Sequence, residues 1–504
     1  MKTTRDASHR IPFGMLMLIL VLAALDQTIL STALPVMARD LPGHWPLAWV
    51  FSAYLMVATV VITLYGRLAD LVGRKPMLLL AIGLFLLGSL ACGVSQDLHQ
   101  LVLSRAIQGA GGGGLMTLTM LSVAEWFPPE QRGRYQGLLG AAYGLATMFG
   151  PLVGGTFVEH LSWRWAFWMN VPLALLALGV LALAWPARAA SASAASTPRG
   201  GSIDWLGALL LTGALVSLLL ATQHGKLTLP DAMSLPLLLM LCGALVLAFL
   251  WRQHRAASPL LPLSLFARPA YAAASVIALV TGMALYAVVV FVPQYLQIGL
   301  HLSPTGSAWH LLPLMAGVTG AAIASGRLLR AQKPVATLAR TACVLMLSSF
   351  GMLIAALHWW PEMPSALSAS LLPLGVGLGL LFPVITVVAQ RVSPAKHMGI
   401  ATAVTVMLRS LGGAVGVAVL ASLLTQRVTQ EMARQVAQQV AQATAQPVSV
   451  HAVSERFTAA LAHSLQPVFG CVAAAVLLAL LASRWMPQGQ GAASLAEPAL
   501  RKAA

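Results

Sequence analysis

The chain has 504 residues, of which 58% are hydrophobic and only 9% are charged. Soluble globular domains carry roughly 25% charged residues, so this composition excludes a soluble enzyme, a disordered protein and a nucleic-acid-binding factor. The net charge of +16 is spread in small groups between apolar runs, which favours a membrane topology over a nucleic-acid partner. Each of the four cysteines stands alone in an apolar run, so the sequence predicts neither a disulfide framework nor a metal site.

Fourteen apolar runs are long enough to cross a bilayer core, which takes about 20 residues of helix. In hydrocarbon every backbone N–H and C=O must be satisfied within its own segment, and these runs are continuous, so we expect helices and not a barrel. The sequence therefore predicts an all-α integral membrane protein with 14 transmembrane helices, at 13–34, 48–66, 76–94, 101–123, 136–157, 165–185, 204–222, 233–250, 270–292, 308–328, 336–358, 366–388, 399–424 and 464–484.

Lysine and arginine are distributed unevenly between the two sides of this topology. With the N-terminus inside, the inner segments hold 21 of the 30 basic residues, whereas the short outer loops hold three, Arg39, Arg164 and Lys226. Cytoplasmic loops carry such an excess, so both termini are expected in the cytoplasm. The first run is long, contains Asp26 and leads to no convincing cleavage site, so we interpret it as a retained helix rather than a signal peptide.

A weak internal repeat divides the chain. GRLAD at 66–70 and GRLLR at 326–330 lie 260 residues apart, and PLVGG at 151–155 and SLGGAVG at 410–416 show a similar offset. The matches predict two pseudo-symmetric six-helix halves plus two extra central helices, a plan in which transporters place their site near the membrane midplane. The predicted parts are a cytoplasmic N-terminal tail (1–12), the N-terminal six-helix half (13–185), a cytoplasmic linker (186–203), the two extra helices (204–250), a cytoplasmic loop (251–269), the C-terminal six-helix half (270–484) with a long outer loop (425–463), and a cytoplasmic tail (485–504).

The long outer loop carries two amphipathic patterns. Apolar residues recur every four positions on both sides of Pro447, at Val428, Met432, Val436 and Val440 and at Val453, Phe457, Leu461 and Leu465. This spacing predicts two helical segments outside the membrane. Either they form a hairpin packed on itself or on the membrane surface, or they dock a partner protein.

Charged residues within the predicted membrane helices need a reason, because a charge at the bilayer centre costs at least about 2.5–3.5 kcal/mol. Asp26 is the one acidic residue that lies deep in a predicted helix; the other thirteen fall in loops or at helix ends. It is a candidate proton or cation carrier, the alternative being a fixed salt bridge. Arg105, about one turn into its helix from the outer side, is within reach of Asp26. Arg409 lies near the midplane, where it either counters Asp26, contacts an anionic substrate or bonds to backbone carbonyls beside nearby glycines.

Glycines are concentrated in a few of the predicted helices. One helix holds Gly109 and the run 111–114, and another holds Gly150, Pro151, Gly154 and Gly155. Small residues let helix backbones approach closely, and Pro151 should kink its helix. The glycines serve either tight packing alone or helices that bend and slide during a conformational cycle. No nucleotide-binding G-x-x-x-x-G-K-[ST] motif occurs, which disfavours an ATP-driven pump.

Several segments resemble the major facilitator superfamily and, within it, the fourteen-helix drug:proton antiporter family of multidrug efflux proteins. They are LDQTILSTALP (25–35), GRLADLVGRK (66–75), RAIQGAGGGG (105–114), GLATMFGPLVGG (144–155), WRWAFWMNVP (163–172), VPQYLQ (292–297) and LRSLGGAVG (408–416). The loop motif at 66–75 indicates only the superfamily, whereas the motifs at 25–35 and 144–155 indicate the narrower family. The resemblance covers about residues 11–485.

The resemblance implies roles for individual residues. Asp26 and Arg105 match the positions linked to proton coupling. The loop that locks the two halves in one state would include Gly66, Asp70, Gly73 and Arg74, and the antiporter motif would include Gly150, Pro151, Gly154 and Gly155. Two departures are that Leu71 stands where the family often has a basic residue, and that Ala146 replaces a frequent glycine.

We therefore expect a proton-coupled secondary active exporter, an antiporter that moves amphipathic drugs or toxic compounds outward by alternating access. The alternatives are an exporter of one specific metabolite, a proton-coupled nutrient importer of the same superfamily, and a membrane sensor or scaffold without transport. No catalytic residues, metal or cofactor are expected, because the proton gradient supplies the energy. The central cavity between the halves would be lined by Gln27, Tyr54, Tyr143, Tyr286, Phe382 and Arg409.

The expected partners are an amphipathic small molecule and membrane lipid, with no nucleic acid. A periplasmic adaptor protein could bind residues 425–463, and the chain is expected to work as a monomeric unit. The expected location is the inner membrane of a bacterium, with both termini cytoplasmic.

Overall fold

The computed structural model describes residues 3–42, 48–127, 129–185, 204–222, 234–256, 259–331, 333–393, 398–441 and 450–488, and the regular elements in these ranges are all helices. The predicted linker at 186–203 and most of the predicted tail at 485–504 lie outside them. The helices are α1 (Thr3–Asp40), α2 (Ala48–Val72), α3 (Arg74–Gly93), α4 (Leu98–Trp126), α5 (Pro129–His160), α6 (Trp165–Trp168), α7 (Asn170–Ala184), α9 (Trp205–Thr222), α10 (Leu235–Arg255), α11 (Leu263–Phe266), α12 (Pro269–Gln294), the π-helix Tyr295–Gly299, α13 (Pro304–Trp309), α14 (Leu312–Arg330), α15 (Val335–Trp359), α16 (Pro364–Val392), α17 (Met398–Ala441), α18 (Val450–Ala482) and a 3₁₀ turn at Ser483–Trp485.

Each of the fourteen predicted spans falls on helical structure, and eleven helical segments of the described chain are long and apolar enough to cross a membrane. The apolar part of α9, Trp205–Ala221, is shorter. Helices α4 and α5 have sufficient length but many glycines, which contribute little hydrophobicity. The chain is thus a multi-pass helical membrane protein, and the number of fourteen crossings stays a prediction.

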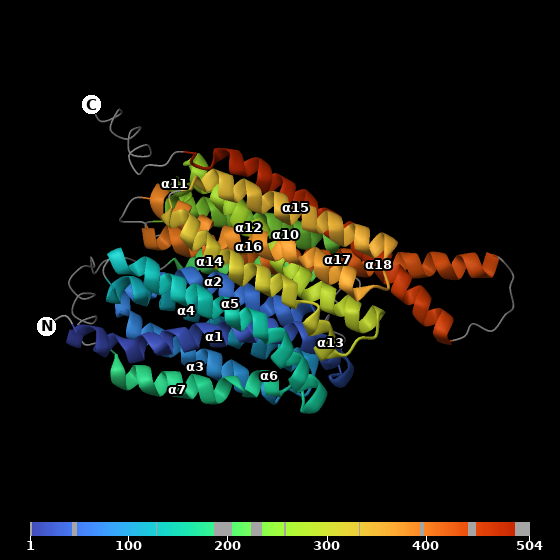
Figure 1. The fold of residues 1–504 in the computed structure, drawn as a ribbon, viewed down its shortest axis with the longest axis horizontal. Coiled ribbons are helices and arrows are strands. Elements are labelled where there is room, and N and C mark those ends of the chain that lie inside the picture. Colours follow the sequence, from blue (N-terminus) through green and yellow to red (C-terminus); the bar gives the residue numbers. More distant parts are fainter. Residues whose placement is uncertain are drawn as a thin grey trace.

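The N-terminal and C-terminal helices occupy two sides of one elongated bundle (Figure 1). Helices α1 to α7, in blue to green, lie along one side, and most of α12 to α18, in yellow-green to red, lie along the other. Helix α1 begins and α18 ends at the same end of the bundle, as an even number of crossings requires.

The same helix pairings recur in both halves. Helix α1 packs on α5, α2 and α3 pack on α4, and α3 packs on α7. In the second half α12 packs on α17, α14 and α15 pack on α16, and α15 packs on α18. The two halves are therefore built on one plan of helix contacts, the plan that the internal repeat predicts.

Glycines make the equivalent contacts possible at matching places. A Cβ atom on Gly109 of α4 would lie 2.4 Å from the carbonyl oxygen of Tyr54, and one on Gly375 of α16 would lie 2.1 Å from that of Leu314. One turn further on, Gly113 and Gly379 meet carbonyl oxygens of α2 and α14 in the same way. Gly375 and Gly379 follow Gly109 and Gly113 by 266 residues, so these contacts align α4 with α16 position by position.

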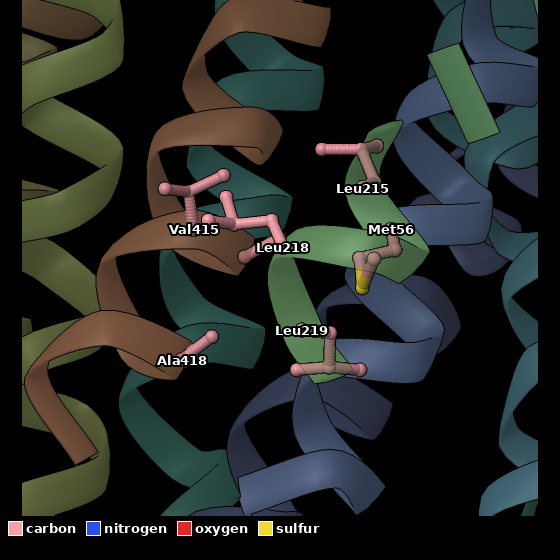
Figure 2. A pocket seen from close by; sticks show the side chains of 7 residues that line it. Met56, Leu215, Leu218, Leu219, Val415 and Ala418 are labelled. Carbon is pink, nitrogen blue, oxygen red and sulfur yellow. The ribbon is translucent and has the colours of Figure 1, made fainter. Parts of the chain in front are cut away.

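The extra helices α9 and α10 pack on each other, and α9 also contacts α2 and α17, which belong to different halves. Helix α9 thus covers a seam where the halves meet. A small hollow remains between these three helices (Figure 2). Its lining is entirely apolar, from Met56, Leu215, Leu218, Leu219, Ala414, Val415 and Ala418.

Asp204 holds one end of this helix pair together. Its carboxylate accepts hydrogen bonds from Arg252 Nε at 2.8 Å, from Gln253 Nε2 at 2.8 Å and from the backbone N–H of Gly207 at 3.0 Å. These contacts join the start of α9 to the end of α10.

Both amphipathic segments predicted in the outer loop are helical, but they do not form separate helices on the surface. Helix α17 continues without interruption to Ala441, and α18 begins at Val450, so each amphipathic segment extends a bundle helix. The extensions project beyond the rest of the bundle (Figure 1). The sequence after residue 424 is rich in Gln and Ala, which are good helix formers and give α17 no reason to stop. Residues 442–449, including Pro447, lie outside the described residues.

Candidate functional site

Asp26 lies on α1 at the centre of a buried polar cluster. Its side chain is 1% exposed, and its carboxylate receives three hydrogen bonds. Arg105 Nη1 donates to Oδ2 at 2.8 Å, Gln108 Nε2 donates to Oδ1 at 2.6 Å, and Asn170 Nδ2 donates to Oδ1 at 3.0 Å. The predicted contact between Asp26 and Arg105 is confirmed as an ion pair of two buried side chains.

Arg105 on α4 is held on every side. Besides Asp26, it donates from Nε to the carbonyl oxygen of Val50 at 3.2 Å and from Nη1 to Oε1 of Gln108 at 2.6 Å. Its guanidinium stacks on the ring of Tyr54, with Cζ 4.2 Å from the ring centroid. A buried ion pair offsets its desolvation only when the remaining donors and acceptors are also satisfied. Both Nε and Nη1 of Arg105 have such partners.

Three polar residues of this cluster were missed by the sequence analysis. Gln108 lies three residues after Arg105 and so on the same face of α4. Its Nε2 also donates to Ser89 Oγ on α3 at 2.8 Å. Asn170, the first residue of α7, donates to the same Ser89 oxygen at 3.3 Å. Gln108 and Asn170 lie within the segments RAIQGAGGGG and WRWAFWMNVP. A polar side chain in an apolar run is the sequence feature that could have identified them as functional candidates.

Local sequence explains how four helices converge here. A Cβ atom on Gly88 would lie 2.4 Å from Cα of Gln108, so this glycine lets α3 approach α4 closely enough for Ser89 to reach Gln108. Helix α6 runs through Met169, which keeps helical backbone angles, into α7, so Asn170 lies near the start of one helical span.

A second group of predicted residues joins the two halves beside the ion pair. Tyr286 of α12 donates its hydroxyl proton to Oε1 of Gln27 at 2.7 Å, one residue along α1 from Asp26. The ring of Tyr286 also packs edge-to-face on Phe51 of α2, with centroids 5.2 Å apart. Tyr143 of α5 is half-buried against the core. The contact between Gln27 and Tyr286 ties α12 of the C-terminal half to the residue that follows Asp26 on α1.

Arg409 of α17 lies apart from the ion pair. Its Cζ lies 4.8 Å from the ring centroid of Phe382, and its Nη2 lies 3.6 Å from Sδ of Met116. No carboxylate among the described side chains lies within ion-pair distance of it. The predicted alternative in which Arg409 pairs with Asp26 is therefore not what this structure has.

The residues of the predicted locking loop join α2 to α3. Gly73 has a φ of 99°, a left-handed conformation that favours glycine. Arg74 Nη1 donates to the carbonyl oxygen of Leu121 on α4 at 2.5 Å. Gly66 has open space around its Cα, and the side chain of Asp70 lies outside what the structure describes. The loop therefore ties the start of α3 to α4.

The antiporter-motif residues press α5 onto α1 close to Asp26. A Cβ atom on Gly150 would lie 1.9 Å from Thr28 Oγ1, and one on Gly154 would lie 2.5 Å from the carbonyl oxygen of Ile29. Thr32 Oγ1 donates to the carbonyl oxygen of Pro151 at 3.2 Å. These contacts leave no room for a side chain at either glycine.

At the opposite end of the bundle from the locking loop, the two halves touch directly. A Cβ atom on Gly155 of α5 would lie 2.7 Å from Cα of Thr305 in the other half. The backbone N–H of Thr305 donates to Glu159 Oε1 at 2.9 Å, and Gln297 Nε2 donates to the carbonyl oxygen of Thr32 at 3.3 Å. In the predicted topology this is the outer side, and we call these contacts the outer closure.

Two helical halves of one plan, one of which encloses a buried ion pair within the membrane bundle, are the architecture of a secondary transporter. The chain belongs to the Major Facilitator Superfamily, whose sequence profile matches residues 16–417. It is accordingly a transporter and not an enzyme.

Named relatives agree with this family. A Mycobacterium tuberculosis protein named an uncharacterized MFS-type transporter is 36% identical over 414 residues, which make up 81% of this chain and 58% of that protein. The chain thus spans less than two thirds of that relative's length. Multidrug resistance protein 3 of Bacillus subtilis is 30% identical over 418 residues, 82% of this chain and 79% of the relative.

Solved structures show the same fold. A D-xylose-proton symporter superposes with a TM-score of 0.62 at 14% identity, over 95% of this chain and 98% of the symporter. A bacterial homologue of the human lysosomal transporter Spinster, in an inward-facing conformation, gives a TM-score of 0.61 at 16% identity, over 95% and 98% of the two chains. At such low identity the likeness concerns the fold alone.

Proposed function

We propose that the protein is a proton-coupled exporter, an antiporter that carries amphipathic compounds outward by alternating access. The observation that carries the proposal is the buried carboxylate of Asp26, held by Arg105, Gln108 and Asn170 inside the N-terminal half. Among the described side chains it is the one acidic group deep in the bundle. A proton carrier needs such a group, because a carboxylate can exchange a proton while remaining within the membrane.

Protonation of Asp26 would change the forces on both of its main partners. The neutral acid attracts Arg105 much less than the carboxylate does, and its new O–H becomes a donor where the site now supplies only donors. The buried charge of Arg105 would then lack compensation, which favours a rearrangement of α1 against α4. Because Gln27 follows Asp26 on α1 and accepts from Tyr286, that rearrangement reaches the other half directly.

The outer closure supplies the second element of alternating access. Glu159 and Gln297 hold the halves together on that side, so release of a compound outward requires these contacts to open. Proton binding at Asp26 and opening of the outer closure would be linked through α1, which carries both Asp26 and Thr32.

The names of the relatives support an exporter. Several relatives 28–35% identical to the chain are named multidrug transporters or efflux pumps. We therefore assign the chain to the fourteen-helix drug:proton antiporters as part of this proposal. The proposal includes a bacterial inner membrane location with cytoplasmic termini, action as a monomeric unit and a periplasmic adaptor bound at 425–463.

The test uses inside-out membrane vesicles with an imposed proton gradient and the fluorescent lipophilic cation ethidium. Wild type should accumulate the dye when the gradient is applied, and Asp26→Asn should not, because an amide cannot carry the proton. Asp97→Asn is the matched control: Asp97 caps α4 by accepting from the N–H of Gln100, and asparagine caps equally well.

Gradient-driven uptake that persists in Asp26→Asn would contradict the proposed role of the carboxylate. Uptake in no variant, across a panel of dyes that includes anions, would favour an exporter of one metabolite or a nutrient importer instead. Equal loss in Asp97→Asn would mean that the assay reports folding rather than proton coupling.

A further inference from the structure

The two arginines deep in the bundle are compensated very differently. Arg105 is 1% exposed and has a carboxylate, an amide oxygen and a carbonyl oxygen as partners. Arg409 is half-buried, and its observed partners are the face of Phe382 and the sulfur of Met116. An aromatic face and a thioether are weak partners for a full positive charge. Of these two arginines, only Arg105 has an ion pair, and Arg409 lies within ion-pair distance of no described carboxylate.

A small hollow lies beside the guanidinium of Arg409. It is formed by three helices of the C-terminal half, α12, α16 and α17, and is lined by Ala278, Phe382, Ile385, Thr386, Thr405, Val406 and Arg409. Arg409 is its sole charged lining residue. Aliphatic and aromatic side chains make up most of the remaining wall.

The two threonines offer the hollow no free hydroxyl donor. Thr386 donates its hydroxyl proton to the carbonyl oxygen of Phe382 at 3.1 Å, and Thr405 donates to that of Thr402 at 2.8 Å. Their hydroxyl protons are thus committed to their own helices. A polar ligand group in this hollow would find its strong donors on Arg409, whose planar guanidinium can bind a carboxylate through two parallel hydrogen bonds.

We propose that this hollow is the subsite for the acidic group of the transported compound, and that the substrates include amphipathic organic anions such as aromatic carboxylates. The inference rests on the proposed export function and names its substrate class. A compound with an acidic group and an apolar ring meets both features of the wall, the single cation and the hydrocarbon around it.

Met116 gives the subsite a connection to the other half. This residue belongs to α4, the helix that also carries Arg105. Its sulfur accepts a weak hydrogen bond from Nη2 of Arg409. A bound carboxylate would be a far stronger acceptor than a thioether and would displace it. Anion binding would then break a contact between the two halves. Binding of the anion in the subsite would thus favour separation of the halves.

The charge balance of this exchange follows from the substrate class. When one organic anion leaves and one proton enters, two positive charges move inward in total. A membrane potential that is negative inside therefore favours both movements, the entry of the proton and the exit of the anion. Export of a monovalent cation for one proton would instead be electrically silent.

Equilibrium binding to the purified full chain in detergent tests the subsite without requiring transport. The probes are 2-naphthoate and 2-naphthylmethylammonium, which share a ring and differ in charge, and the measurement is isothermal titration calorimetry. Wild type should bind the carboxylate, and Arg409→Gln should weaken it at least tenfold, since a charge-assisted bidentate contact is lost. Arg409→Lys, which keeps the charge but not the fork, should fall between them.

The ammonium probe and a second variant exclude a merely structural effect. Arg409→Gln should leave the binding of 2-naphthylmethylammonium unchanged or tighter, and Arg340→Gln, at another half-buried arginine of the C-terminal half, should alter neither probe. Absent binding of 2-naphthoate to wild type, equal binding by Arg409→Gln, or equal loss of both probes would overturn the inference. Anion binding without proton-driven uptake would leave the subsite in place and contradict only the proposed antiport.

Discussion

The two halves of the protein are alike in their helix packing and unlike in the chemistry that this packing encloses. Glycines align α4 with α16 at an offset of 266 residues. At that offset Arg105 corresponds to Leu371 and Gln108 corresponds to Leu374, both leucines being fully buried. The N-terminal half thus places a charge and an amide where the C-terminal half places aliphatic side chains.

The third helix of each half shows the same difference. Gly111 meets the carbonyl oxygen of Ala81 on α3, and Gly377 meets that of Ala342 on α15, which aligns these helices at an offset of 261. Ser89 then corresponds to Phe350, whose ring is buried against Phe469. The polar cluster is therefore not required by the shared architecture. Its confinement to one half indicates a functional role, and it leaves the C-terminal half free to form the apolar hollow beside Arg409.

The largest effect is expected when the side chains of the corresponding residues Arg105 and Leu371 are each replaced by alanine. Arg105→Ala should destabilise the protein by about 3–5 kcal/mol, because the buried charge of Asp26 loses its partner. Leu371→Ala should cost a similar amount, about 2–5 kcal/mol, through a cavity. Proton-driven uptake should separate them: at least about 100-fold slower in Arg105→Ala, equivalent to about 3 kcal/mol, and less than about tenfold slower in Leu371→Ala.

Thermal unfolding in detergent and vesicle uptake would be measured on the same preparations. If uptake falls equally in both variants, the polar cluster has no special part in transport, and the difference between the halves is only one of packing.

The shared part of the plan can be tested at its glycines. Gly109→Ala and Gly375→Ala each place a methyl group against a backbone carbonyl, so each should destabilise the fold by about 1–3 kcal/mol. Gly351→Ala is the control, since Gly351 of α15 has open space around it and alanine favours helix by about 0.5–1 kcal/mol. A large difference between Gly109→Ala and Gly375→Ala in thermal unfolding would show that the two seams are not equivalent.

The smallest expected effect concerns the outer closure and its pH dependence. Burial raises the pKa of Glu159, but hydrogen bonds from Ser303 and the Thr305 backbone N–H outweigh it and place the pKa below its usual value of 4.5. A lowered pKa means that the carboxylate favours the closed form fully above that usual value. This contribution is lost as the pH falls through the lowered pKa.

Spin labels on cysteines at the exposed positions Leu161 and Trp309 would report the distance between the halves on this side. Glu159→Gln should widen the distance distribution slightly at neutral pH and remove its change on acidification below about pH 4.5. An unchanged acid response in Glu159→Gln would assign the response to another group.

Sequence reasoning located the helices and the ion pair because both depend on strong one-dimensional signals. Apolar runs of bilayer length are hard to mistake, and Asp26 and Arg105 stand out as charges within them. Gln108, Ser89 and Asn170 were not found, because the partner of a neutral polar side chain depends on how neighbouring helices are rotated. Gly88 sets the close approach of α3 to α4 here, and this contact cannot be read from the sequence before the helices are packed.

The extension of α17 beyond its membrane segment was missed for a different reason. Hydropathy marks where a helix leaves the bilayer but not where it ends, and the residues after 424 are polar helix formers. The amphipathic spacing of Val428 and Met432 correctly indicated helix, and continuity with α17 was the part that the pattern did not contain.

Helix α9 has a consequence for compounds dissolved in the lipid. Because it rests against both α2 and α17 and carries α10 on its outer side, a molecule diffusing within the bilayer toward that seam meets two added helices instead of the boundary between the halves. Sideways entry from the hydrocarbon is thereby obstructed on one flank of the transporter. The two inserted helices therefore restrict the directions from which a lipid-soluble compound can enter. This restriction does not depend on the pocket that binds the compound.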